Sequence, residues 1–242
     1  MKTYIHFILF FSLIAFMNAG TLKGKVTGPP KPRKPINDIA SDPICNASHS
    51  NGLPLSESYI IDSNGGLANA LIWLENVDYK GSPPKEHKTL DQKGCIYIPH
   101  VMGIMKNQEL HISNSDATMH NIHTKSDINP FFNEAQPLGT PPKVKKFEKS
   151  EAPFYVKCDV HPWMKSWVGV FNHPYYTVTN PDGTYSIDNI PEGTYDVVFW
   201  QEKLSRLPAE KYIIKSNKVT ITINKEGVTN QDFAFSKPEK KN

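Results

Sequence analysis

Hydrophobic and polar residues alternate in short runs along most of the chain, with turn-forming residues between the runs. Residues 20–28 (Gly-Thr-Leu-Lys-Gly-Lys-Val-Thr-Gly) alternate as a half-buried strand does, and residues 70–77 form an apolar run typical of a buried strand. The same reading predicts strands at 95–100, 109–114, 147–158, 167–171, 175–179, 184–187, 195–200, 218–223 and 231–235. The 20 prolines and 14 glycines fall mostly between these runs, which favours many short strands over long helices. The pattern therefore predicts an all-β protein built from sandwiches.

Residues 127–143 interrupt the alternation. They contain Pro130, Pro137, Pro141 and Pro142 and show no regular period. A segment of this length without secondary structure is usually functional or mobile. We expect an irregular loop here.

The first nineteen residues have the composition of a signal peptide. Lys2 precedes an apolar run over residues 4–16, and Ala19 supplies the small residue that cleavage requires. The run is short for a transmembrane helix, although an uncleaved anchor is the alternative. The sequence has no second apolar stretch of spanning length, so we expect a periplasmic or secreted protein without a transmembrane segment in its mature chain.

Composition and charge narrow the class of protein. Hydrophobic residues make up 38% and charged residues 21%, as in globular proteins. The formal net charge of +3 is nearly neutral and argues against general nucleic-acid binding. The chain has three cysteines, an odd number for an exported protein, which favours one disulfide and one thiol kept for another purpose.

The segment Cys158-Asp-Val-His161-Pro-Trp-Met164 indicates what that purpose is. It places a thiolate, an imidazole and a thioether within seven residues. Two histidines, one cysteine and a weak axial methionine are the ligand set of blue-copper electron-transfer sites. The second histidine must come from elsewhere, and His120 and His123 are candidates. Since they are three residues apart, a strand would turn them to opposite faces, so we expect one of them to be a ligand.

These residues resemble the cupredoxin family, most closely its amicyanin and plastocyanin-type members. The resemblance covers residues 92–171 and depends on two motifs, Asn114-Ser-Asp116 with His120-Asn121-Ile-His123, and Cys158-x-x-His161-x-x-Met164. It implies a Greek-key β-sandwich that holds one copper ion, Cu(I) or Cu(II). The resemblance implies that copper is bound by His120, Cys158, His161 and Met164. It also implies that Asn121 ties the two ligand-bearing segments together, and that His123 lies beside the ligands or is an extra ligand. Pro162 and Trp163 would form a rim where a redox partner docks.

With Cys158 assigned to the metal, Cys45 and Cys95 remain as the expected disulfide. The bond would close a loop of about fifty residues and stabilise the fold by roughly 4 kcal/mol in the chain-entropy model. It would attach the polar segment that follows the signal peptide to the start of the copper domain.

A second resemblance begins after the copper motif. Residues 182–195 (Asp-Gly-Thr-Tyr-Ser-Ile-Asp-Asn-Ile-Pro-Glu-Gly-Thr-Tyr) are similar to the carboxypeptidase regulatory-like domain, a small non-catalytic transthyretin-like β-sandwich. Residues 20–27 and 70–74 look like the first strands of the same domain. The copper domain would then be inserted into this sandwich. In the alternative arrangement, residues 20–173 are all cupredoxin and the rest of the chain is an appended sandwich. The chain divides into a signal peptide (1–19), N-terminal strands of the regulatory-like sandwich (20–78), a cupredoxin-like copper domain (88–173), the rest of the sandwich (174–236) and a basic tail (237–242).

These observations predict an exported mononuclear, type 1-like copper protein. It would pass single electrons to and from an unidentified redox partner protein through an exposed edge of His161. The alternatives are a periplasmic copper-binding or carrier protein without electron transfer, and a non-catalytic structural or binding β-sandwich module. We do not expect an enzyme, because multicopper enzymes need several His-x-His pairs and the sequence has none.

Overall fold

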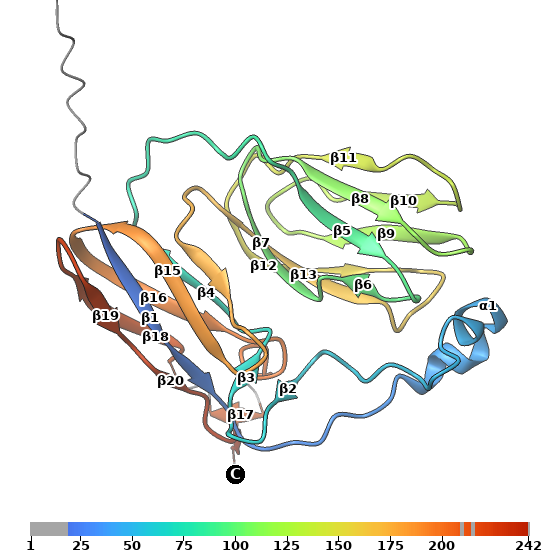
Figure 1. Cartoon of the computed structure of the whole chain (residues 1–242), viewed down its shortest axis with the longest axis horizontal. Helices are drawn as coiled ribbons and strands as arrows, with labels where there is room; N and C mark the ends of the chain where they lie inside the picture. Colours follow the sequence, from blue (N-terminus) through green and yellow to red (C-terminus); the bar gives the residue numbers. More distant parts are fainter. Residues whose placement is uncertain (1–18, 209–210, 214–215, 242) are drawn as a thin grey trace, which may run out of the picture.

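The structure is a computed structural model that describes residues 19–208, 211–213 and 216–241 (Figure 1). Apart from Ala19, the predicted signal peptide lies outside the described residues, as does Asn242 at the end of the basic tail. Within the described ranges, no helix has the length and apolar character needed to span a membrane. Nearly all elements in these ranges are strands; the exceptions are a 3-10 helix, η1 (Asn37–Ser41), and a short α-helix, α1 (Pro43–Ala47). The prediction of an all-β protein is confirmed.

The first sandwich contains strands from both ends of the chain. Its core is formed by side chains such as Leu22, Ile72 and Phe199, which are fully buried between its two sheets. One sheet has the order β15 (Thr184–Pro191), β1 (Ala19–Thr27) and β19 (Val228–Asn230), and β20 (Phe233–Ala234) also pairs with β1. The other has the order β14 (Tyr176–Val178), β4 (Leu71–Glu75), β16 (Gly193–Trp200) and β18 (Lys218–Ile223).

The second sandwich contains the middle of the chain. Leu90, Ile112 and Val168 belong to its separate core. Its larger sheet has the order β10 (Asn133–Gln136), β9 (His120–Lys125), β12 (Glu151–Lys157), β13 (Lys165–Phe171) and β7 (Val101–Met105). Its smaller sheet has the order β11 (Lys143–Lys145), β8 (Leu110–Asn114), β5 (Lys88–Gln92) and β6 (Tyr97–Ile98). Two short pairs complete the fold: β2 (Ile60–Ile61) with β3 (Leu67–Ala68), and β17 (Tyr212–Ile213) with β21 (Glu239–Lys240).

The strands of the second sandwich, β5 to β13, all lie between β4 and β14 of the first, as Figure 1 shows by the change of colour between the two bodies. The pairing of β4 with β14 and β16 joins the N-terminal strands to the C-terminal ones. Of the two arrangements that the sequence leaves open, the strand pairing corresponds to insertion.

Several strands, among them β5, β7 and β19, lie where the sequence pattern predicts none, and two further segments also differ from the expectation. The expected loop at 127–143 contains β10, which pairs antiparallel with β9 from Asn133 opposite His123 to Gln136 opposite His120. β10 is an edge strand without large apolar side chains, and the residue it buries, Gln136, is polar, so its sequence lacks the apolar alternation that marks a strand. The strand expected at 95–100 is shortened to β6, since Gly94 and Cys95 adopt φ of 66° and 53° in the turn that joins β5 to β6.

Aromatic side chains and a buried ion cluster join the two sandwiches. Trp167 of the second sandwich packs 5.3 Å from Trp200 of the first, measured between ring centres. Beside them, the Glu202 carboxylate lies between two positively polarised groups: its Oε2 is 2.7 Å from His100 Nε2, and its Oε1 is 2.9 Å from Lys165 Nζ. Burial raises the pKa of Glu202, but the hydrogen bond with His100 and the charge of Lys165 outweigh burial and lower the pKa to about 2. Ionised Glu202 therefore stabilises the contact between the sandwiches.

We expect the substitution Glu202→Gln to lower the free energy of unfolding by about 3 kcal/mol at pH 7. The pKa of Glu202 is depressed from 4.5 to about 2 in the folded chain, so this stabilisation is present above pH 4.5 and is lost as the pH falls toward 2. Urea unfolding at pH 7 and at lower pH measures the difference. Glu192→Gln, at an exposed glutamate, is the control and should change the free energy by less than about 0.5 kcal/mol. A loss that is the same at every pH would contradict this account.

Candidate metal centre

Three strands of the larger sheet bring the candidate ligands together at one end of the second sandwich. His120 is the first residue of β9, and Cys158 follows the last residue of β12. β12 pairs with β9 on one side and with β13 on the other. The loop between β12 and β13 is closed by the Met164 N–H, which donates to the His161 carbonyl at 2.9 Å. Strand pairing thus brings together segments that are far apart in sequence.

The donor atoms of His120, Cys158 and His161 converge. One ligand atom from each residue lies within 4.8 Å of the others. The two Nδ1 atoms of His120 and His161 are 2.8 Å apart, and Cys158 Sγ is 3.9 Å from His161 Nδ1. The exposed fractions of the three residues are 0%, 1% and 3%. Met164 is also fully buried and belongs to the same hydrophobic cluster as Cys158.

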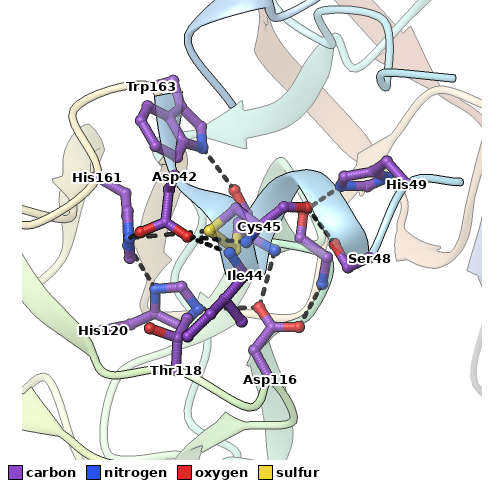
Figure 2. The surroundings of a disulfide bond; sticks show 12 residues. Asp42, Ile44, Cys45, Ser48, His49, Asp116, Thr118, His120, His161 and Trp163 are labelled. Atoms are coloured by element: carbon purple, nitrogen blue, oxygen red, sulfur yellow. Dashed lines mark hydrogen bonds and ion pairs between the residues drawn. A yellow bond between two sulfur atoms is a disulfide. The ribbon is translucent and has the colours of Figure 1, made fainter. Parts of the chain in front are cut away.

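A carboxylate faces the outer nitrogen of each histidine (Figure 2). Asp116 Oδ2 lies 2.9 Å from His120 Nε2, and Asp42 Oδ2 lies 3.5 Å from His161 Nε2. Both rings therefore direct Nε2 outward and Nδ1 toward Cys158. In metal sites, such carboxylates fix the orientation of the imidazole ring and raise its basicity as a ligand.

The protonation of these groups follows from their surroundings. Burial lowers the pKa of His120, but Asp116 and Cys158 raise it more, so its net pKa is above the usual value. Burial, together with the charge on His120, lowers the pKa of His161 despite Asp42. These directions fit one proton between the two Nδ1 atoms, donated by His120 and accepted by His161.

The sulfur of Cys158 is surrounded by hydrogen-bond donors. The backbone N–H groups of His161 and Asn121 point to it, at 3.3 Å and 3.5 Å. Burial raises the pKa of the Cys158 thiol, but His120 and these backbone donors lower it more, and the net pKa is below the usual value. Since the thiolate is the form that binds metals, the site favours a soft or borderline metal ion.

Asn121 connects the two ligand-bearing segments. Its Oδ1 accepts the backbone N–H groups of Asp159 at 2.6 Å and of Val160 at 3.3 Å. Its Nδ2 donates to Asn133 Oδ1 at 2.6 Å on β10. One amide side chain thus links β9, β10 and the ligand loop.

His123 lies on the other face of β9. Its Nδ1 is 2.7 Å from Asp159 Oδ2, and Lys157 Nζ is 2.5 Å from the second oxygen of the same carboxylate. Of the two histidines on β9, the structure brings His120 to Cys158 and His161 and places His123 outside that group.

The expectation of an exposed edge on His161 is wrong, because a segment far away in sequence covers it. The disulfide predicted between Cys45 and Cys95 is present, and it fixes α1 over the end of the second sandwich. Cys45 Sγ lies 3.8 Å from His161 Nε2, and His161 is only 3% exposed.

The two residues of the expected docking rim differ in their surroundings. Pro162 is exposed, whereas Trp163 is half-buried with its ring centre 5.0 Å from that of His161. Trp163 Nε1–H donates to the Cys95 carbonyl at 2.9 Å, so the indole is held beside the disulfide. A docking role for Pro162 and Trp163 stays a prediction.

Sequence reasoning missed the carboxylates and the helix that covers the site. Asp116 stands in the motif that carries the resemblance, but no role follows for it from the sequence. Asp42 precedes Pro43, and aspartate at the N-cap followed by proline is a known signal for the start of a helix. That signal could have located α1, although not the histidine that Asp42 faces.

No family model and no curated protein matches this sequence. Among solved structures, a Cu-containing nitrite reductase from Thermus scotoductus SA-01 is 21% identical over 40% of this chain and 25% of its own, with a TM-score of 0.31. A purple cupredoxin from Nitrosopumilus maritimus is 20% identical over 34% of this chain and 98% of its own (TM-score 0.30). Amicyanin from Paracoccus versutus is 19% identical over 36% of this chain and 83% of its own (TM-score 0.31). The chain spans a quarter of the nitrite reductase, and these partial similarities do not assign it to a family.

We expect Asn121→Ala to lower the free energy of unfolding by about 1–3 kcal/mol, because it leaves the N–H groups of the ligand loop without their acceptor. Urea unfolding of the metal-free protein measures the loss. Asn64→Ala, at an exposed asparagine, is the matched control and should change little. Equal effects of the two substitutions would show that Asn121 does not tie the segments together.

Proposed function

We propose that this chain holds one copper ion between His120, Cys158 and His161, with Met164 as a weak fourth ligand, and that it transfers single electrons. The observation that carries the proposal is the convergence of one cysteine sulfur and two Nδ1 atoms within 4.8 Å at a buried position. Thiolate sulfur favours Cu(I), and imidazole suits copper in both oxidation states. When bound, copper would supply the one-electron couple between Cu(I) and Cu(II).

The residues of the chain fit this ion in chemistry and in orientation. The lowered pKa of Cys158, set by burial against the stronger effect of His120 and backbone donors, favours the thiolate. Asp116 and Asp42 hold the outer nitrogens, so both rings keep Nδ1 toward the sulfur. Asn121 and the pairing of β12 restrict movement of the ligand loop. A centre held in this way changes little in shape when its charge changes, which suits electron transfer.

A second candidate function is copper binding or transport without electron transfer. The burial of His161, whose exposed fraction is 3%, favours it, because a redox partner has no direct access to that ring. The same ligands would serve to hold Cu(I) for delivery. The two functions differ in whether the ion is retained through repeated oxidation and reduction.

The proposed location is the periplasm or the exterior of the cell. The Cys45–Cys95 disulfide supports it, since disulfides persist mainly in oxidising compartments. The proposed partner is a redox protein of unidentified type. We propose a binding and electron-transfer role rather than an enzymatic one, because α1 and the disulfide fill the outer side of the histidines where a substrate would have to enter.

The test is the visible absorption spectrum of the mature protein after one equivalent of Cu(II). We expect an intense thiolate-to-copper band that mild reductant bleaches and oxidant restores. Cys158→Ser should abolish the band, and His123→Ala should retain it, because His123 lies outside the ligand group. Persistence of the band in Cys158→Ser would refute the proposed ligand set. Tight Cu(I) binding without a reversible band would favour the carrier function instead.

A further inference from the structure

On the basis of the proposed copper site, we propose that Asp42 is a positioning residue for that site. From the disulfide-linked helix α1 it holds the outer nitrogen of His161, so that Nδ1 of this ring faces the metal, as Asp116 does for His120. Asp42 comes from outside the sequence region that resembles a copper domain. The segment that covers the site, residues 36–54 (the covering segment), is therefore part of the proposed metal centre.

The Asp42 carboxylate is fixed by the helix that it caps. Its Oδ1 accepts the backbone N–H groups of Ile44 at 2.9 Å and Cys45 at 2.8 Å. These two bonds direct the second oxygen, Oδ2, to His161 Nε2 at 3.5 Å. The carboxylate therefore has one oxygen for the helix and one for the imidazole.

Asp116 is held in the corresponding way on the other side of the disulfide. Its Oδ1 accepts the Gly94 N–H at 2.6 Å, and its Oδ2 accepts the Cys95 N–H at 2.8 Å while it faces His120 Nε2 at 2.9 Å. Each cysteine of the disulfide thus donates its backbone N–H to the carboxylate that faces one histidine. The disulfide connects the two carboxylate–histidine pairs, as Figure 2 shows.

Further contacts hold the covering segment in place. Ile39 of η1 is fully buried in the core of the second sandwich. His49 Nε2 lies 2.7 Å from the Gly94 carbonyl, and Trp163 Nε1–H donates to the Cys95 carbonyl. Since the segment is attached by packing, hydrogen bonds and a covalent bond, Asp42 has a fixed position relative to His161.

The matched variants are Asp42→Asn and Asp38→Asn. Asparagine keeps the N-cap of α1 but removes the negative charge, which separates the effect on His161 from loss of the helix. Asp38 is an exposed aspartate of η1, four residues earlier, and serves as the control. Asp116→Asn is the positive control, because its carboxylate contact is the shorter of the two.

The first measurement needs no metal. Nitrogen-15 NMR of the histidine rings in the metal-free protein reports which nitrogen of His161 carries the proton. We expect Nε2–H in the wild type and in Asp38→Asn, and a larger fraction of Nδ1–H in Asp42→Asn. Identical protonation of His161 in all three proteins would overturn the proposal.

The second measurement is Cu(II) affinity, by competition with a chelator. Removing such a carboxylate from a metal-bound histidine typically weakens binding ten- to one-hundred-fold, and we expect a loss in this range for Asp42→Asn and none for Asp38→Asn. If Cu(II) loses ten-fold more affinity than Cu(I), the reduction potential rises by about 59 mV. Unchanged affinity and potential in Asp42→Asn, with a loss in Asp116→Asn, would also overturn the proposal.

The two measurements separate this proposal from the proposed function. If the wild type shows no thiolate-to-copper band, the electron-transfer function fails, and the NMR comparison still decides whether Asp42 positions His161. If the band is present and Asp42→Asn matches the wild type in both measurements, the function stands and the role of Asp42 fails.

Discussion

β12 lies between β9 and β13, and its two rows of backbone hydrogen bonds determine where every ligand-bearing segment lies. Lys157 at its end is opposite His123 on β9 and Lys165 on β13, which places His120 and the ligand loop at the same end of the sheet. Because side chains alternate between the two faces of a strand, a shift of one residue would turn His120 away from the core and His123 into it. Everything proposed for the metal centre depends on this register.

The covering segment adds a second constraint from a different part of the chain. Residues 36–54 have little core of their own, and α1 is only five residues long. The stability of this segment must therefore come from contacts with the second sandwich. The disulfide provides one such contact at Cys95, a residue in the left-handed region that favours glycine. The hydrogen bonds of Gly94 and Cys95 to Asp116 stabilise the same turn. The helix α1, the turn at Gly94 and Cys95, and the Asp116 carboxylate therefore depend on one another for their positions.

The sequence predicted those parts of the structure that have a local signal. The hydrophobic pattern identified β1 by alternation and β4 by a continuous apolar run, and the ligand loop was recognisable because its donors lie within seven residues. β10 was missed because an edge strand needs no apolar face. The contact of Asp42 with His161 could not be predicted, because the local sequence does not indicate which distant residue an N-cap carboxylate will face. Insertion of one sandwich into the other was left open because the same strands occur in the same order in both arrangements.

The discontinuous first sandwich has a consequence for the order of folding. β1 and β4 are synthesised first, but their partners β15 and β16 follow only after the entire second sandwich. Bringing such distant strands together costs loop-closure entropy, and folds rich in non-local contacts form slowly. The strands of the second sandwich, β5 to β13, are continuous in sequence and can pair first, which shortens the effective loop between β4 and β14. The inserted strands therefore help to assemble the sandwich that contains them.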